Sequence, residues 1–197
     1  MTQLGTHIES LLSLDRQLNL IKYSNAAAKG GYIIEMGIFR GGSLSILAKF
    51  NPGIDILAFD SFEGVPEGNA HDIHQSGDFG GLDSRAIIGY FNMVYPAVRI
   101  FKGWIPKIFE AIDGNTRCSF CHIDLDMNES VRLACDFIFP RMLSGGIILF
   151  DDYKQKTTPG ATIAIDEFFA DKDCAFKGEL FFYEGGPTHY QYLVVVK

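Results

Sequence analysis

The stretch YIIEMGIFRGGSLSILAKF, residues 32–50, decides the fold. It opens with YIIEM, a short apolar run rich in β-forming residues, which predicts a buried strand. Glycines follow at once, and the closing SLSILAKF has the spacing of a helix. A strand that leads through a tight turn into a helix is one βα unit, and repeated units of this kind build parallel sheets.

The same unit recurs along the chain. Further strand-like runs are DILAF (55–59), AVRIF (97–101), CSFCHI (118–123) and GIILF (146–150). Helical patterns fall at 83–94, 105–112, 129–143 and 162–170, and Pro140 is expected to kink or split the third of these. Near-continuous apolar strands that alternate with helices indicate a parallel sheet covered by helices on both faces.

The end of the chain breaks this alternation. ELFFY (179–183) and YQYLVVV (190–196) read as strands joined by the turn EGGPTH (184–189), with no helix between them. A hairpin at the end of a parallel sheet makes one strand at or near its edge antiparallel. The sequence therefore predicts a single α/β domain, residues 1–197, whose mostly parallel seven-stranded sheet carries an antiparallel C-terminal hairpin strand.

Two segments lie outside the alternation. Residues 1–30 read as an N-terminal helix, because Thr6 and Glu9 fit a capping box and apolar residues recur at helical spacing. Residues 61–81 are rich in glycine and polar residues and are too long for an ordinary βα connection. Loops of this length in compact domains are usually lids or binding loops, so a lid is expected here.

The bulk composition narrows the function classes. The 197 residues suffice for one domain with an ample core, since 47% of them are apolar. A net charge of −7 without any cluster of lysines or arginines speaks against a nucleic acid or an anionic membrane as partner. Neither a signal peptide nor an apolar run of about 18 residues is visible, which predicts a soluble, cytoplasmic protein.

The four cysteines indicate buried, reduced thiols. Cys118 and Cys121 form a C-x-x-C pair, but no second pair follows at the spacing of a zinc site. They lie on a predicted strand, where residues three apart face opposite sides of the sheet. A metal or redox role for these cysteines is therefore not expected.

The first crossover carries the signal of a ligand site. Glu35 and Gly37 end the strand, and Gly41, Gly42 and Ser43 lead into the helix. Glycines let the backbone bend sharply and approach a ligand, and a helix N-terminus offers unpaired N–H groups to an anion. The spacing differs from the G-x-G-x-x-G of diphosphate binders, and by itself the pattern fits an ordinary tight βα turn equally well.

An acid at the end of the second strand strengthens this signal. Asp60 follows DILAF, where a carboxylate can accept hydrogen bonds from both hydroxyls of a ribose, although it also fits a turn cap. The turn that contains Gly37, Gly41 and Gly42 (the glycine turn) and the acid Asp60 together suggest a nucleoside ligand without a diphosphate. S-adenosylmethionine has this chemistry, because it joins adenosine to a sulfonium and an amino-acid tail.

Four aspartates end two strands that are expected to be neighbours. Asp124 and Asp126 follow CSFCHI, and Asp151 and Asp152 follow GIILF. Neighbouring strands lie about 4.8 Å apart, so the four carboxylates should converge at the carboxyl edge of the sheet, where such sheets bind ligands. Oxygen ligands select hard cations, so an ion such as Mg²⁺ would offset their repulsion. Helix caps and solvated acids are the alternative interpretation.

Several motifs together resemble a known family. They are EMGIFRGGS (35–43), AFDSFEGVPEG (58–68), GDF (77–79), FKGWIP (101–106), HIDLDMNES (122–130), GGIILFDDY (145–153) and PGATIAIDEFF (159–169). In order and spacing they resemble the macrocin O-methyltransferase (TylF-type) family, over roughly residues 30–197. Members of that family are S-adenosylmethionine- and divalent-metal-dependent enzymes that methylate hydroxyls on sugars of antibiotics and related natural products.

The resemblance implies a Rossmann-like class I methyltransferase fold and roles for individual residues. The implied metal ligands are Asp124, Asp151 and Asp152, and the implied general base is Asp126. The residues implied in cofactor binding are Glu35, Gly37, Ser43, Asp60, Ser61, Lys102, Gly103 and Trp104. The implied reaction is methyl transfer from S-adenosylmethionine to an acceptor hydroxyl of a sugar that Mg²⁺ orients under a closed lid. Members commonly dimerise, so a homodimer is in line with the resemblance.

Two features depart from the family pattern. Asn128 stands where the family usually has an aromatic residue. Only about one helix precedes the first strand, whereas members that act on antibiotics tend to have a longer N-terminal region. Both features predict an acceptor pocket that differs from the family's or is more open.

Two other functions remain as hypotheses. One is a module that binds S-adenosylmethionine without catalysis. The other is a haloacid-dehalogenase-like Mg²⁺ phosphatase, which also combines a D-x-D with a D-D pair. That fold has its D-x-D on the first strand, whereas three or more predicted strands come before it here.

Overall fold

Seven strands form one sheet in the order β3-β2-β1-β4-β5-β7-β6. The computed structural model describes residues 8–182 and 189–197. The strands are β1 (Tyr32–Met36), β2 (Ile56–Asp60), β3 (Val98–Lys102), β4 (Cys118–Ile123), β5 (Met142–Tyr153), β6 (Cys174–Phe182) and β7 (His189–Val196). Because β1 to β5 pair in parallel, the predicted α/β fold with a mostly parallel seven-stranded sheet is confirmed.

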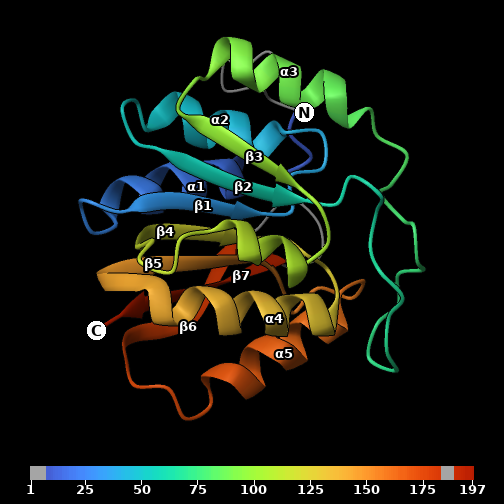
Figure 1. The fold of residues 1–197 in the computed structure, drawn as a ribbon. Coiled ribbons are helices and arrows are strands. Elements are labelled where there is room, and N and C mark those ends of the chain that lie inside the picture. Colours follow the sequence, from blue (N-terminus) through green and yellow to red (C-terminus); the bar gives the residue numbers. More distant parts are fainter. Residues whose placement is uncertain (1–7, 183–188) are drawn as a thin grey trace.

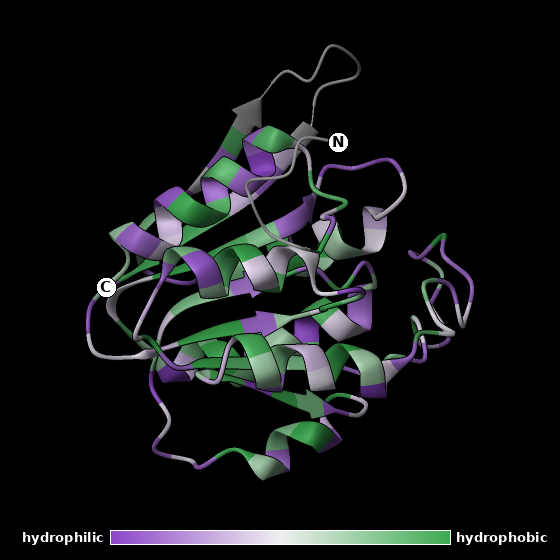
Figure 2. Cartoon of the chain, turned by 90° about the horizontal axis from the view of Figure 1, so that it is seen from above, coloured by the Kyte–Doolittle hydropathy of each residue, from purple (hydrophilic) through white to green (hydrophobic). Residues whose placement is uncertain are grey.

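Helices cover both faces of the sheet. They are α1 (Leu14–Ala26), α2 (Gly42–Phe50), α3 (Ser84–Val94), α4 (Asn128–Ile138) and α5 (Pro159–Phe169), with 3-10 helices η1 (Lys107–Ala111) and η2 (Phe139–Arg141). One buried cluster joins α1, α2 and α3 to the sheet, and a second joins α4 and α5 to it. Figure 2 shows strands of mainly apolar residues lying between the helices. None of the described helices is long and apolar enough to cross a membrane.

The strand order places a switch point between β1 and β4. β1 pairs with β2 on one side and with β4 on the other, parallel to both. The chain leaves β1 toward one half of the sheet and β4 toward the other, so the two connections part and leave a crevice. Ligands of open α/β sheets bind at this point. In Figure 1 the long segment between β2 and α3 runs beside the arrowheads of these strands.

The C-terminal strands supply the antiparallel element. β7 lies between β5 and β6 and runs antiparallel to both. This agrees with the predicted antiparallel strand near the edge. β6 begins at Cys174, earlier than the predicted run at 179–183, and most of the predicted turn EGGPTH falls on residues 183–188, outside the described residues.

The N-terminal helix is shorter than predicted. It begins at Leu14, and its N-cap Ser13 accepts a backbone hydrogen bond from the first turn. Glu9 is not helical, so the expected capping box is wrong in its position; Thr6 lies outside the described residues. The segment before the helix packs on the glycine turn instead, where a Cβ added to Gly42 would lie 2.7 Å from the carbonyl oxygen of Glu9.

Two other predicted helices differ in extent. α4 ends at Ile138 and Pro140 follows within η2, as expected of a proline that splits a helix. The rest of the predicted range, Met142 and Leu143, already belongs to β5. The predicted helix at 105–112 is the short 3-10 helix η1.

The cysteines are free thiols, and all but the partly exposed Cys174 are buried. Cys118 and Cys121 pack into the same buried cluster, although they were expected on opposite faces of the sheet. The strand register shifts between Cys118 and Phe120, and this irregularity breaks the strict alternation of side chains.

Candidate active site

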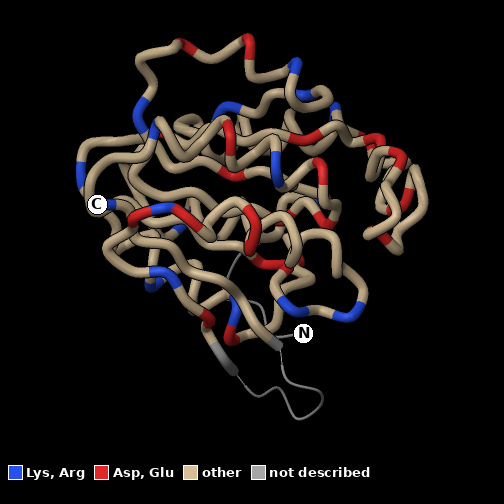
Figure 3. The backbone as a smooth tube through the Cα atoms, turned by 90° about the horizontal axis from the view of Figure 1, so that it is seen from below, with Lys and Arg blue, Asp and Glu red and all other residues tan. Residues whose placement is uncertain are grey.

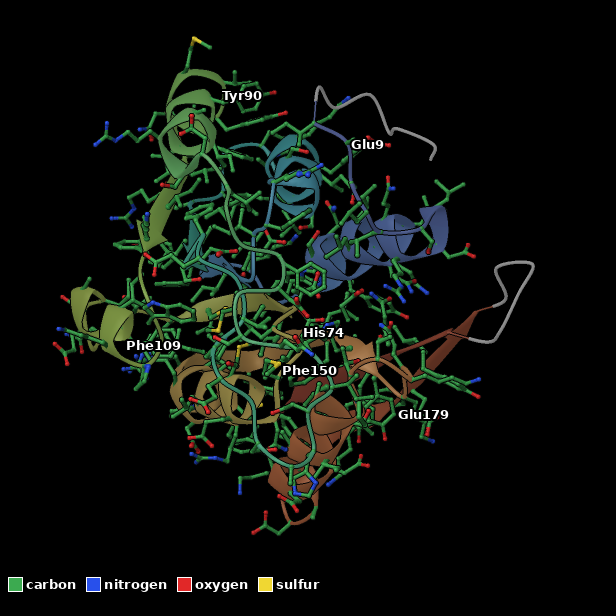
Figure 4. All side chains as sticks on the ribbon, turned by 90° about the vertical axis from the view of Figure 1, so that its right-hand side faces the viewer. Glu9, His74, Tyr90, Phe109, Phe150 and Glu179 are labelled. Carbon is green, nitrogen blue, oxygen red and sulfur yellow. The ribbon has the colours of Figure 1, made fainter. Side chains whose placement is uncertain are left out.

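A cavity of about 400 Å³ opens at the carboxyl edge of the sheet. Its walls come from the glycine turn after β1, the end of β2, the loop after β3, both acidic strand ends and the segment before α1. Figure 4 looks onto this edge and shows Glu9 on that segment and His74 of the 61–81 loop near the centre of the view. The volume lies within the range of small-molecule sites.

Asp60 holds the glycine turn in its conformation. One oxygen of its carboxylate accepts hydrogen bonds from the N–H groups of Ile38 at 2.6 Å and Phe39 at 2.9 Å. The other oxygen accepts one from the N–H of Phe62 at 2.6 Å. Phe39 and Phe62 have positive φ angles of 49° and 58°, which are unfavourable for residues other than glycine. The carboxylate therefore stabilises the turn; it also lines the cavity, and one of its four lone-pair positions is not used by these three bonds.

Gly37 brings the glycine turn into contact with the first acidic strand end. Its φ is +89°, and an added Cβ would lie 1.8 Å from the carbonyl oxygen of Asp124. The N–H of Asp124 in turn donates to the carbonyl oxygen of Met36 at 2.9 Å. Only glycine permits both this backbone conformation and this close approach. The end of β1 and the start of the D-x-D turn are thus one packed unit.

Three of the four aspartates converge in the cavity. Asp124, Asp126 and Asp152 each offer a carboxylate oxygen, and these atoms lie within 4.8 Å of one another. The backbone N–H of Asp126 donates to Oδ2 of Asp152 at 2.9 Å, and Asp126 has a φ of +60°. The D-x-D turn is therefore bent back onto the end of β5. We call these three residues the acidic cluster.

Burial and mutual repulsion make the acidic cluster hard to ionise. Burial, followed by the charges of Asp151 and Asp152, raises the pKa of Asp124 well above its ordinary value. Burial and the charge of Asp152 raise the pKa of Asp126 to about 8. Burial and the charge of Asp151 raise the pKa of Asp152 to about 6, against the backbone hydrogen bond that lowers it. A nearby cation would favour the charged forms.

Asp151 lines the same cavity and forms an ion pair with Arg16. Nη1 of Arg16 on α1 donates to Oδ2 of Asp151 at 2.8 Å, and Nε2 of Gln191 on β7 donates to Oδ1 at 2.8 Å. Asn19 of α1 donates to Oε1 of Gln191 at 2.8 Å. The side chain of Asp151 is only 3% exposed. These contacts join α1 to the ends of β5 and β7.

Most residues that the sequence predicts for the site line the cavity. They are Gly37, Ser43, Asp60, Ser61, Gly103, Trp104, Asp124, Asp126, Asp151 and Asp152. Glu35 is fully buried within the sheet, where its Oε1 lies 3.1 Å from Nδ1 of His122. Lys102 is exposed, and its Nζ donates to the hydroxyl of Ser84 at 3.3 Å. The structure does not bring Glu35 or Lys102 to the cavity wall.

The 61–81 loop contains no helix or strand, in agreement with the prediction, and it is anchored beside the D-x-D turn. Asp72 accepts a hydrogen bond from the N–H of Asn128 at 2.8 Å, at the start of α4, where the N-cap residue supplies no side-chain bond. Nδ2 of Asn69 donates to Oδ1 of Asn128 at 3.0 Å, and Asn128 donates to the carbonyl oxygen of Gly160 on α5 at 2.9 Å. Asn128 therefore joins the loop to both helices.

The same loop brings the acid Glu67 to the cavity wall and places an imidazole near Asp126. Figure 3 shows Asp and Glu residues along it, and residues 61–81 contain no Lys or Arg. Nε2 of His74 lies 3.9 Å from Oδ1 of Asp126, and its Nδ1 lies 3.4 Å from Oδ2 of Asp78. The ring of His74 packs edge-to-face on Phe79 at 5.0 Å between centroids. His74 thus faces the carboxylate that the resemblance makes the general base.

The contribution of the N-terminal segment was missed from the sequence. Glu9, Leu11 and Arg16 line the cavity, although residues 1–30 were expected to form only a packed helix. A lone arginine on an amphipathic helix carries no local signal, and its partner Asp151 is 135 residues away in the chain. The partners of Asn128 are 32 to 59 residues away in the chain, so no local spacing marks them either.

The fold is that of the class I methyltransferases. The O-methyltransferase NovP matches it with a TM-score of 0.79 at 20% identity, over 95% of this chain and 82% of that one. An O-methyltransferase from Bacillus cereus in complex with SAH matches with a TM-score of 0.67 at 16% identity, over 94% of this chain and 82% of that one. At these identities the likeness establishes the fold.

The sequence establishes the family. Residues 13–176 match the macrocin O-methyltransferase (TylF) family, and the chain belongs to it. A tetracenomycin-C rhamnosyl 4'-O-methyltransferase of Streptomyces olivaceus is 26% identical, over 62% of this chain and 53% of the relative. Demethyldecarbamoylnovobiocin O-methyltransferase of Streptomyces niveus is 24% identical, over 74% of this chain and 60% of the relative. The matches thus span little more than half the length of these curated relatives.

Proposed function

We propose that the protein is an S-adenosylmethionine-dependent O-methyltransferase that acts, with a divalent cation such as Mg²⁺, on a hydroxyl of a sugar-containing small molecule. The observation that carries the proposal is the convergence of Asp124, Asp126 and Asp152 within 4.8 Å, in the same cavity that the glycine turn lines. Membership of the TylF family and the names of the two relatives support the reaction and the acceptor class.

The glycine-turn side of the cavity suits the cofactor. Ser43 lies in the first turn of α2, whose unpaired N–H groups attract the carboxylate of an amino-acid tail. Three backbone N–H groups already bond to the carboxylate of Asp60, which leaves one lone-pair position for a ribose hydroxyl. Trp104 lines the other wall and offers a flat apolar surface to adenine. Glu35 and Lys102 are left out of the direct contacts, since neither lines the cavity.

The acidic side of the cavity fits a hard divalent cation. Asp124 and Asp152 would hold it. The family resemblance implies Asp151 as a third ligand and makes Asp126 the general base. Burial and mutual repulsion raise the pKa values of Asp124 and Asp152, and a bound cation would favour their charged forms. When bound, such a cation lowers the pKa of an acceptor hydroxyl and orients it.

Asp126 is the proton acceptor in this proposal. It lines the cavity, and a cation bound beside it would keep its carboxylate ionised and able to accept a proton. A general base placed in this way typically contributes about 10²–10⁴-fold in rate. The 61–81 loop, with His74 facing Asp126, would shield the reacting atoms from water.

The remaining wall of the cavity is apolar. Leu11, Phe39 and Phe79 line it, and Leu11 and Phe79 are 59% and 45% exposed. Large exposed apolar side chains at the mouth of a polar site favour an acceptor with an apolar body beside its sugar hydroxyl. This agrees with an acceptor that is a glycosylated natural product rather than a free sugar.

The test is a methyl-transfer assay with labelled S-adenosylmethionine and a panel of glycosides, with Mg²⁺ or with EDTA. We expect turnover that EDTA abolishes. Asp124→Asn should lower it about 100-fold or more, because a charge is lost from the cation site, while calorimetry shows that the cofactor still binds. Asp171→Asn, at an exposed acid far from the cavity, is the matched control. Turnover that neither EDTA nor Asp124→Asn affects would remove the cation from the proposal.

The two alternative functions have unequal support. The phosphatase hypothesis has none, since the D-x-D follows β4, β7 is antiparallel and the chain belongs to a methyltransferase family. A non-catalytic cofactor-binding module would bind S-adenosylmethionine in calorimetry and transfer no methyl group to any glycoside of the panel.

A further inference from the structure

We propose that Arg16 is the counter-ion of the four aspartates that line the cavity, Asp124, Asp126, Asp151 and Asp152 (the acidic site). Arg16 competes with the divalent cation for the negative charge of these aspartates, so that α1 sets the metal affinity. This inference rests on the proposed function, because it takes a cation at Asp124 and Asp152 as given. Arg16 belongs to none of the motifs that mark the site in the sequence, and it touches the site only through the tertiary fold.

The contact between α1 and the acids is buried and doubly supported. The side chains of Arg16 and Asp151, which meet at 2.8 Å, are 13% and 3% exposed. Gln191 is fully buried, donates to the second oxygen of Asp151 and accepts a hydrogen bond from Asn19. Arg16 and Asn19 are three residues apart and so share one face of α1. One face of the helix therefore holds Asp151 both directly and through Gln191.

Arg16 is also placed to act on the whole acidic site. It lines the cavity together with Asp124, Asp126 and Asp152. Among the described residues that line the cavity, the cations are Arg16 and Arg40, and the guanidinium of Arg40 lies over the ring of Phe39. Arg16 is thus the cation that faces the acids.

A guanidinium and a divalent cation draw on the same negative charge. In the metal-free protein Arg16 offsets part of the repulsion among the carboxylates, since an ion pair is far less costly to bury than a lone charge. Once a cation enters, the positive charge of Arg16 opposes it, and such repulsion is strong in a partly buried site. Arg16 therefore stabilises the metal-free protein and lowers the cation affinity at the same time.

Arg16→Gln separates these two effects. Calorimetric titration of the variant with MgCl₂ alone is expected to give an affinity about tenfold or more above that of the wild type, since a like charge is removed beside the ion. In EDTA the melting temperature should fall below that of the wild type, because Asp151 is left buried without its partner. A purely structural arginine would lower the melting temperature and leave the Mg²⁺ affinity unchanged or weaker, and that result would overturn the inference.

A matched control and a second comparison complete the test. Lys22→Gln removes an exposed cation from the same helix and should leave the Mg²⁺ affinity unchanged. Asp151→Asn removes the negative charge of the ion pair and keeps the positive one, whereas Arg16→Gln combined with Asp151→Asn replaces the ion pair by a neutral pair. The double variant should bind Mg²⁺ more tightly than Asp151→Asn. Equal or weaker binding would refute the competition even if Arg16→Gln by itself does not fold.

The inference and the proposed function fail in different ways. A wild type that binds Mg²⁺, with the same affinity in Arg16→Gln, would end the inference and leave the proposed function in place. If neither the wild type nor any of these variants bound Mg²⁺, the cation site would be wrong and the inference would be lost with it.

Discussion

Asp151 and Asp152 are neighbours in the sequence, but the first contacts a cation and the second lies among other carboxylates. Asp152 accepts a hydrogen bond from the D-x-D turn and belongs to the acidic cluster, whereas Asp151 is paired with Arg16. Regular strand alternation does not explain the division, because the register of β5 against β7 shifts between Phe150 and Tyr153, across the two aspartates. The division follows instead from what each carboxylate meets in space, Arg16 of α1 or the D-x-D turn.

The comparison of Asp151 with Asp152 shows that burial alone does not determine the role of a carboxylate. Asp151 is 2% and Asp152 is 5% exposed, so the two are almost equally desolvated. A carboxylate that faces a guanidinium has its charge offset within the protein and anchors a helix. One that faces other carboxylates takes up a proton more readily, unless a nearby cation favours its charged form. The partner, rather than the strand end itself, separates an anchor from a candidate ligand.

The largest expected effect tests this separation directly. Asp152→Asn should lower methyl transfer about 100-fold or more, because the acidic cluster loses a charge. Asp151→Asn should cost only about tenfold, as is typical of a group that supports a metal site from outside. Initial rates at saturating Mg²⁺ measure both. Equal losses would break the comparison and make Asp151 a ligand, as the family resemblance implies.

An intermediate effect concerns stability and pH in the metal-free protein. The pKa values of Asp126 and Asp152, about 8 and about 6, lie above the ordinary value near 4. The folded protein therefore binds more protons than the unfolded chain between these values, and its stability should fall as the pH rises from about 4 to about 8. Thermal unfolding in EDTA across this range measures the fall.

Two controls sharpen this measurement. Mg²⁺ should reduce the fall, since it favours the ionised carboxylates. Asp126→Asn should also make the pH dependence shallower, because it removes the group with the higher of these two pKa values. A melting temperature that rises with pH in EDTA would contradict the raised pKa values of the acidic cluster.

The smallest expected effect concerns the support of the D-x-D turn. Asn128→Ala removes the side-chain bonds from α4 to Asn69 and Gly160 and should cost about 1–2 kcal/mol of unfolding free energy. Amide hydrogens of residues 61–81 should exchange faster, because the loop loses an anchor. Asn92→Ala, at an exposed position on α3, is the control. Unchanged exchange in the loop would show that Asn128 does not hold it.

Much of the fold was predictable because its signals are local. The strands at 32–36 and 118–123 have the predicted bounds, and Pro140 ends α4 as expected. Errors occur where a distant contact overrides the local pattern. The segment around Glu9 packs on Gly42 instead of forming a helix, and a register shift turns Cys118 to the same face as Cys121.

The candidate site was predictable only in part. The glycine turn and all four aspartates reach one cavity, because strand ends in a parallel sheet meet at one edge. Which aspartates approach one another was not readable, since Arg16 and Gln191 come from elements far away in the chain. The anchoring of the loop through Asn128 was hidden for the same reason.

By itself the sequence determined the order of the βα units, the glycine turn and the placement of acids at two strand ends, because periodicity and residue type act over a few neighbouring positions. The tertiary structure alone decided that Asp152 joins Asp124 and Asp126 while Asp151 goes to Arg16. Electrostatic pairing depends on distance in space, and a helix packed over the end of β5 supplies the charge that divides two adjacent, chemically identical side chains.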